Sequence, residues 1–252
     1  MGEAGRTFHG YKEGAYDLPN DAQEQDRLDL QHAMFTLVLD GRLALAPMQS
    51  TPKHVMDVAT GTGIWANQFA QQNPSSFVIG TDLSLIQPDP ETTGIRNCEF
   101  IRDDAEEEWV YPQTTFDYVH IRAVALSFQN PRTVLRNALN NMSPGGWIEY
   151  QDLDLTPRSH DGSHEVVDVN ELTFEIPANG WPDDPKLKRI GEYMLLDFYE
   201  NSYGASFKLL RSLGMSTEEI EDVVSHFKRD APNRRNHIFY RFHVVYGRKP
   251  ST

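Results

Sequence analysis

Residues 57–65 read Asp57-Val58-Ala59-Thr60-Gly61-Thr62-Gly63-Ile64-Trp65 and are the most informative segment of the chain. The apolar residues around Asp57 predict a strand, and the residues after Gly63 predict a helix, so two glycines lie at a strand-to-helix turn. Glycine lets the backbone approach a ligand closely, and the free N–H groups of a helix N-terminus favour an anionic group. Gly61, Gly63 and Ala66 also satisfy a dinucleotide-binding fingerprint. The stretch therefore indicates a ligand site, with a tight turn that binds nothing as the alternative.

Short apolar segments alternate with helical patterns on both sides of this turn. Strands are predicted at 55–58, 77–80, 99–101, 116–121 and 147–150, and helices from about 20 to 40, within 61–72 and at 132–141. Such alternation predicts an α/β fold with a doubly wound, mostly parallel sheet, whose ligand lies beyond the carboxyl ends of the strands.

The C-terminal third has a different pattern, without a domain linker or an internal repeat. Strand-like content at 166–176 is followed by helices at 186–199, 206–213 and 217–228 and by a final strand at 238–246. We therefore expect a single domain, made of an N-terminal arm and helix (1–50), a cofactor-binding core (51–154) and a C-terminal part with a helical insertion (155–252).

The composition excludes several classes of protein. The chain has 252 residues and a net charge of −14, without clusters of Lys or Arg, so nucleic acid and membrane are not expected as partners. Cys98, the single cysteine, cannot form an internal disulfide, and the nine histidines show no metal-ligand spacing. We expect a soluble cytoplasmic protein without a metal, with the nucleus as another possible location.

Three carboxylates accompany successive predicted strands: Asp57 lies on the first, Asp82 ends the second and Asp104 follows the third. In a parallel sheet they converge on one edge, where they would repel a pyrophosphate, and no Arg or Lys is evident near the turn to offset them. They suit S-adenosylmethionine, which offers a sulfonium, an ammonium, a ribose diol for Asp82, an adenine amino group for Asp104, and one carboxylate for the glycine turn. A helix cap or a solvated strand end is the alternative for each Asp taken alone.

Further motifs in order along the chain resemble one family. They are Arg27–His32 (RLDLQH), Leu39–Leu43 (LDGRL), the glycine turn, Gly80–Ser84 (GTDLS), Asp103–Glu106 (DDAE), Phe116–His120 (FDYVH), Ser143–Glu149 (SPGGWIE) and Val244–Pro250 (VVYGRKP). This set is similar to the LaeA-like methyltransferases of filamentous fungi, which are class I S-adenosylmethionine-dependent enzymes and regulators tied to secondary metabolism.

The resemblance implies a seven-stranded sheet, an N-terminal lid helix and a helical insertion before the last strand. It also implies a set of cofactor-binding residues: Asp57, Gly61 and Gly63 at the methionyl part, Asp82 at the ribose, and Asp104 with Ala105 at the adenine, with Leu83 as a further cofactor-binding residue. His120, at a strand end, is a further candidate, with a packed structural histidine as the alternative. Tyr11, Tyr16 and the face formed by Arg27, Gln31 and His32 would form the lid; otherwise the tyrosines lie on an arm and a backbone carbonyl satisfies His32.

The segment between the fifth and sixth predicted strands is short for this family. Residues 155–165 contain Pro157 and Gly162 and few apolar residues, so they cannot form the amphipathic crossover helix that parallel neighbouring strands need. The loss would remove one wall of the acceptor pocket. A protein partner covering the gap, a non-catalytic auxiliary protein, and missing coding sequence each account for it.

We therefore expect an S-adenosylmethionine-dependent methyltransferase that acts on a small molecule in, or associated with, fungal secondary metabolism. The alternative is a non-catalytic, cofactor-binding auxiliary or regulatory protein, so enzymatic activity itself stays open at this point. No catalytic residue is identified, because transfer from a sulfonium depends mainly on orientation. A nicotinamide-dependent oxidoreductase is a third reading of the glycine turn.

Overall fold

The computed structural model describes residues 7, 11, 19–111, 115–125, 127–159 and 171–251. Its helices are α1 (Ala22–Val38), α2 (Ile64–Gln72), α3 (Pro90–Thr93), α4 (Pro131–Asn141), α5 (Pro185–Ser212) and α6 (Thr217–Asp230). Its strands are β1 (His54–Val58), β2 (Phe77–Asp82), β3 (Cys98–Arg102), β4 (Phe116–Arg122), β5 (Met142–Ser159), β6 (Glu171–Pro177) and β7 (Ile238–Arg248).

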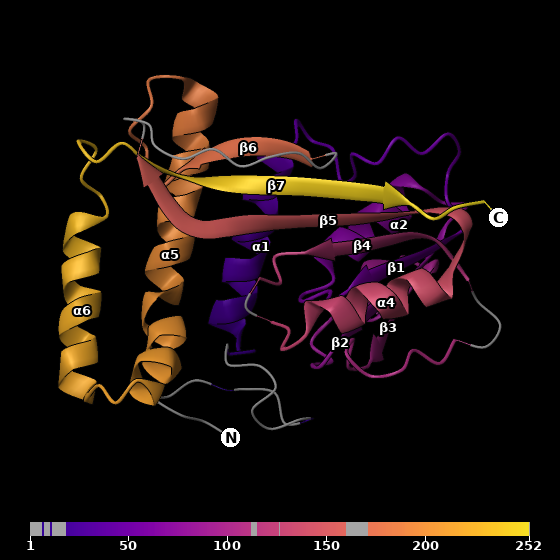
Figure 1. Ribbon diagram of the computed structural model, residues 1–252, viewed down its shortest axis with the longest axis horizontal. Helices are drawn as coiled ribbons and strands as arrows, with labels where there is room; N and C mark the ends of the chain where they lie inside the picture. Colours follow the sequence, from indigo (N-terminus) through magenta and orange to yellow (C-terminus); the bar gives the residue numbers. More distant parts are fainter. Residues whose placement is uncertain are drawn as a thin grey trace.

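The strands form one seven-stranded sheet in the order β3-β2-β1-β4-β5-β7-β6 (Figure 1). Strands β1 to β5 pair in parallel, whereas β7 runs antiparallel to both β5 and β6. The predicted α/β fold with a mostly parallel sheet is confirmed. Because the carboxyl ends of the parallel strands share one edge, residues that follow β1, β2, β3 and β4 are brought together there.

Helices cover both faces of the sheet. On one face, Trp65 and Phe69 of α2 pack on β1 and β4, and a second cluster joins α1 and α5 to the half of the sheet formed by β5, β7 and β6. On the opposite face, Val134 and Ala138 of α4 pack against Val119 and other residues of β4. The sheet is therefore doubly wound, and α1 lies on the same face as α2.

Helix α1 has a capped start and a defined end, and its second turn is fixed to α5. Its N-cap is Asp21, whose side chain accepts the backbone N–H of Glu24 at 3.0 Å, and it ends just before Asp40 and Gly41, which both have positive φ. In its second turn, the buried Arg27 donates to Glu24 at 2.7 Å and to Asp197 of α5. Burial raises the pKa of the Asp197 carboxyl, and Arg27 opposes that rise. Arg27 therefore fixes α1 against α5.

Two elements are longer than the sequence predicts. Strand β5 extends to Ser159 because β7 pairs with it from Trp147 to Ser159, which supplies backbone partners that a local pattern does not reveal. Helix α5 is continuous over 28 residues where two helices are expected, since Gly204 within a helix costs only about 1 kcal/mol relative to alanine. The single-turn helix α3 lacks any periodicity and is not predicted.

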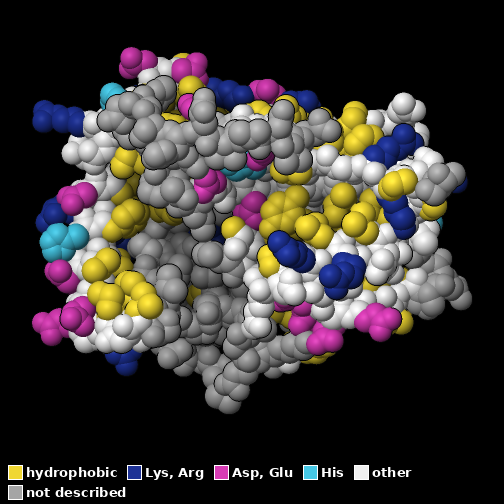
Figure 2. Space-filling view, viewed as in Figure 1, with side chains coloured by type: hydrophobic (Ala, Val, Ile, Leu, Met, Phe, Trp, Pro, Cys, Tyr) yellow, Lys and Arg dark blue, Asp and Glu magenta, His cyan; other side chains and the backbone are white. Residues whose placement is uncertain are grey.

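The face of β5 and β7 that adjoins α4 is less completely covered by helices than the opposite face, where α1 and α5 pack. Tyr150 and Val245 on this face are only half-buried, and Figure 2 shows hydrophobic side chains gathered above α4. Among the residues that the structure describes, none forms a helix between β5 and β6. The predicted sixth strand begins at 166, but residues 160–170 lie outside the described part, so only its segment from Glu171 is observed.

Candidate functional site

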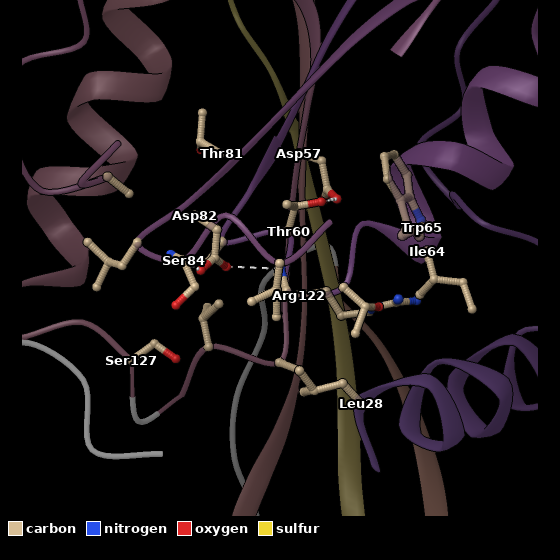
Figure 3. A pocket seen from close by; sticks show the side chains of 18 of the residues that line it. Leu28, Asp57, Thr60, Ile64, Trp65, Thr81, Asp82, Ser84, Arg122 and Ser127 are labelled. Atoms are coloured by element: carbon tan, nitrogen blue, oxygen red, sulfur yellow. Dashed lines mark hydrogen bonds between the residues drawn. The ribbon is translucent and has the colours of Figure 1, made fainter. Parts of the chain in front are cut away.

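A pocket lies at the carboxyl ends of β1, β2, β3 and β4, between these strand ends and α1 (Figure 3). Seven of the eight residues predicted to bind a cofactor line it: Asp57, Gly61, Asp82, Leu83, Asp104, Ala105 and His120. Gly63 is not among the lining residues. The predicted convergence of the three Asp residues on one edge is therefore observed.

The glycine turn has a specific geometry that explains both glycines. Gly61 and Gly63 have φ of 59° and 76°, and Ala59 before them has φ 53°, a conformation unfavourable for a non-glycine residue. A Cβ atom on Gly63 would lie 2.5 Å from Cζ of Phe100, whereas one on Gly61 would lie 3.5 Å from Leu28 of α1. A side chain at Gly63 would therefore clash with Phe100 at the start of α2, whereas at Gly61, which lines the pocket, only the positive φ disfavours a side chain.

Asp82 connects the end of β2 to the turn. One carboxylate oxygen accepts the N–H of Gly61 and the other accepts the N–H of Ser84, both at 2.9 Å. Burial raises the pKa of Asp82 to about 6, and the two backbone hydrogen bonds limit the rise. Asp82 is therefore mostly ionised at neutral pH, with lone pairs left to accept hydroxyl groups from the pocket.

Asp57 is engaged by the protein itself. Its Oδ1 accepts from Nδ1 of His120 at 2.7 Å, and its Oδ2 accepts the hydroxyl of Thr60 at 2.5 Å. The imidazole of His120 stacks on Trp65 with ring centroids 3.7 Å apart. Because Nδ1 donates to Asp57, the buried Nε2 carries a lone pair when the ring is neutral, and it has no hydrogen-bond partner among the described residues. Asp57 thus orients a polar atom of His120 in the pocket wall.

The end of the pocket near β3 combines polar and apolar groups. Asp104 accepts the N–H of Glu106 at 2.8 Å, the local capping role considered as its alternative. The carbonyl of Ala105 accepts from Nε1 of Trp109 at 3.0 Å, which fixes the loop after β3. Leu83, from the end of β2, adds an apolar surface. This part of the pocket suits a flat ring with polar edges.

The expectation that no Arg or Lys lies near the turn is wrong, because Arg122 at the end of β4 lines the same pocket. Its Nη2 donates to Nδ1 of His32 at 2.6 Å, and Nε2 of His32 lies 3.0 Å from Oε1 of Gln68 in α2. An arginine can only donate, so Nδ1 of His32 accepts and its Nε2 carries the hydrogen. Burial and the charge of Arg122 lower the pKa of His32 to about 4, so His32 is neutral.

The lid predicted from the N-terminal residues is present in part. Gln31 and His32 line the pocket, whereas Arg27 points to α5 and does not. Side chains, rather than a backbone carbonyl, satisfy His32. The guanidinium of Arg102 lies over the ring of Tyr11, with Cζ 5.9 Å from the ring centroid. Tyr16 lies outside the described residues.

The described residues also bear on metal sites and membrane spans. No group of three or more His, Cys, Asp or Glu side chains in this part of the chain is placed to hold a metal ion. Over the same residues, none of the helices has the length and apolar character needed to cross a membrane.

The strand order and the position of the pocket are those of class I S-adenosylmethionine-dependent methyltransferases. A family model described as a methyltransferase domain matches residues 30–188. Methyltransferase pytC of Aspergillus terreus is 31% identical over 285 residues, covering 98% of this chain and 87% of that protein. The secondary metabolism regulator laeA of Aspergillus fumigatus is 30% identical, with 98% and 76% covered. The chain belongs to the LaeA-like methyltransferase family.

Two further findings come from these comparisons. The alignment with pytC extends over 285 positions, more than the 252 residues of this chain, so pytC contains segments without a counterpart here. Among solved structures, coclaurine N-methyltransferase bound to N-methylheliamine and S-adenosylhomocysteine aligns with a TM-score of 0.49 at 13% identity, covering 93% of this chain and 75% of that one.

Proposed function

We propose that this protein binds S-adenosylmethionine in the pocket at the strand ends and transfers its methyl group to a small molecule in, or associated with, fungal secondary metabolism. The observation that carries the proposal is the convergence of Asp57, Asp82 and Asp104 around the glycine turn, inside a pocket that belongs to a methyltransferase-family domain. A site with this excess of carboxylates favours a ligand with net positive charge.

The residues present fit the cofactor group by group. Asp82, held by two backbone N–H groups, would accept the ribose hydroxyls. Asp104 and Ala105, next to the apolar Leu83, would hold the adenine. The unpartnered Nε2 of His120 would accept a hydrogen from the ammonium group, and Gly61 would leave room for the methionyl chain. When bound, S-adenosylmethionine supplies an electrophilic methyl group on a sulfonium.

The protein's own contribution is orientation and exclusion of water. Leu28 and Phe35 of α1 line the pocket, Leu28 near Gly61 and Phe35 beside Arg122, so α1 shields it from solvent. Asp57 keeps the His120 ring in place through Nδ1, and Asp82 keeps the turn in place through Gly61. A general base is needed only if the acceptor must lose a proton.

The test is methyl transfer from labelled S-adenosylmethionine into an extract of small metabolites from a producing fungus, with S-adenosylhomocysteine measured as the co-product. We expect sustained, extract-dependent formation of both products by the wild-type protein, and at least a tenfold loss in Asp82→Ala. Labelled product of the same yield with Asp82→Ala would reject the site. Cofactor binding without turnover in any extract would reject catalysis.

A second candidate function is a non-catalytic, cofactor-binding auxiliary or regulator. It is supported by the lack of a helix between β5 and β6 among the described residues and by the extra segments in pytC. The half-buried Tyr150 and Val245 would then lie under a protein partner. Turnover in the assay above would exclude this candidate.

For either function, the acidic composition and the single cysteine support action in the cytoplasm or the nucleus.

A further inference from the structure

Arg122 is the one Lys or Arg among the described residues that line the pocket. It extends from the end of β4 on the same face as His120, two residues earlier, since alternate strand residues share a face. Figure 3 places it between Thr60 and Leu28, with Asp82 and Ser84 on one side and Ile64 and Trp65 on the other. A single cation thus lies within a site whose other charged groups are carboxylates.

The guanidinium of Arg122 has no carboxylate partner among the described residues. Its Nη2 donates to Nδ1 of His32, and its Cζ lies 5.5 Å from the centroid of the Phe35 ring. Nε and Nη1 of Arg122 donate to no described residue. They are not among the buried polar atoms that have no partner, so both retain access to solvent. These donors are therefore reachable from the pocket. Burial lowers the pKa of Arg122 to about 10, and the charge of the nearby Asp57 opposes this only in part. A carboxylate directly on the free donors would therefore be favourable, because carboxylates are the preferred partners of a guanidinium.

The glycine turn is poorly suited to hold an anion through its glycines. The N–H of Gly61 donates to Asp82 at 2.9 Å, and the N–H of Gly63 donates to the carbonyl of Thr60 at 3.0 Å. Moreover, the carboxylate of Asp82 already lies at this turn and would repel a second one. The expectation that the turn binds the cofactor's carboxylate is therefore less favourable than an alternative at Arg122.

We propose that Arg122, held in place by His32, binds the carboxylate of the amino-acid part of S-adenosylmethionine. This inference rests on the proposed function, because it concerns the same cofactor. The cofactor contains a single anionic group, and Arg122 is the single cation that meets it. The ammonium, on the same carbon as the carboxylate, then lies beside His120 and Asp57, and the ribose lies at Asp82, so the charged groups of the pocket select the orientation of the methionyl chain.

The hydrogen bond to His32 gives this contact a second role. His32 belongs to α1 and also bonds to Gln68 of α2, so Arg122 is connected to the lid helix and to the helix after the glycine turn. Because His32 is neutral, it accepts from Arg122 without adding a positive charge beside it. A carboxylate on the free donors of Arg122 would therefore fix the cofactor and α1 together.

The experiment compares two ligands that differ only in the carboxylate: S-adenosylhomocysteine and its decarboxylated analogue, S-adenosyl-3-thiopropylamine. Calorimetric titrations would use wild-type protein, Arg122→Met, Arg122→Lys and the control Arg102→Met, whose arginine lies at the end of β3 outside the pocket lining. We expect the wild type to prefer S-adenosylhomocysteine by about 30-fold or more, as for a buried charge pair that loses one partner.

Arg122→Met should raise the Kd for S-adenosylhomocysteine by about the same factor and change the Kd for the amine analogue by less than about threefold. Arg122→Lys should retain part of the preference, and Arg102→Met should retain all of it. Equal loss for both ligands would assign Arg122 a purely structural role and overturn the proposal. So would a wild-type protein that binds the two ligands equally, a result that does not depend on the variants folding. A wild type that binds neither ligand would instead reject the proposed function, and the inference with it.

Discussion

The ionisation of Asp82 gives the most specific prediction about the site. Burial raises the pKa of its carboxyl to about 6, and the proposed role requires the ionised form, which accepts both ribose hydroxyls. The apparent Kd for S-adenosylhomocysteine should then increase by the factor 1 + 10^(6 − pH), which is about 11-fold at pH 5 relative to pH 8. Between pH 7 and 8 the change should be only about 10%.

The sign of the linkage follows from the direction of the pKa shift. The folded-state pKa of Asp82 lies above the ordinary value of 3.8, so ionisation costs stability as the pH rises from about 4 to 6. Ribose hydroxyls that donate to the carboxylate would offset this cost. Binding at pH 6 should therefore release about half a proton, and the thermal shift produced by S-adenosylhomocysteine should be larger at pH 7.5 than at pH 5.

Calorimetry in two buffers with different ionisation enthalpies measures both the Kd and the proton release. Asp82→Asn should bind more weakly at pH 8 and lose the pH dependence. The matched control is Asp152→Asn: burial raises the pKa of Asp152 to about 6 as well, but the Asp152 carboxylate does not line the pocket and meets it only through the backbone N–H of Val124, which an asparagine oxygen can still accept. That variant should keep the wild-type slope. A Kd that is constant from pH 5 to 8 in the wild type would refute the role given to Asp82.

Two other substitutions test the scaffold of the site. Glu149→Gln should lower the free energy of unfolding by about 2–4 kcal/mol, because this fully buried carboxylate accepts the N–H groups of Leu45 and Ala46. Urea titrations measure the change, with a substitution of the exposed Glu99, Glu99→Gln, as the control. Equal stability of the two variants would contradict the reasoning. Gly63→Ala should cost about 2–4 kcal/mol through positive φ and contact with Phe100, yet leave the Kd for S-adenosylhomocysteine within about threefold of wild type. Gly61→Ala should weaken binding instead; a Gly63→Ala protein as stable as wild type, or one that folds but no longer binds, would be evidence against this division of roles.

The sequence predicts most of the fold because its strands and helices carry their own local patterns. The apolar run at Val55–Val58 and the turn at Gly61 are sufficient to place β1 and α2. Elements that depend on distant partners are missed. The second half of β5 is polar and becomes a strand through pairing with β7, and α5 continues through a glycine at which a local pattern breaks.

The site shows the same division between local and distant signals. Asp82 and Ala105 are found in the pocket because each follows a recognisable strand, as the sequence indicates. Arg122 is missed, since its neighbours in space, His32 and Gln68, come from helices far away in sequence. The alternation of β4 does indicate that Arg122 shares a face with His120, but not that the side chain reaches the glycine turn, which depends on those distant helices. Gly63 has a ligand-site pattern but contacts Phe100, which no spacing rule reveals.

Calorimetric titration of the wild-type protein with S-adenosylhomocysteine at pH 8 decides whether the pocket is a methyltransferase cofactor site, together with the same titration of Asp82→Ala and a titration of the wild type with NADH. A methyltransferase site built on Asp82, the glycine turn and the other carboxylates predicts binding in the micromolar range, at least a tenfold loss in Asp82→Ala, and no binding of NADH. No heat with S-adenosylhomocysteine, or binding of NADH in its place, would contradict it.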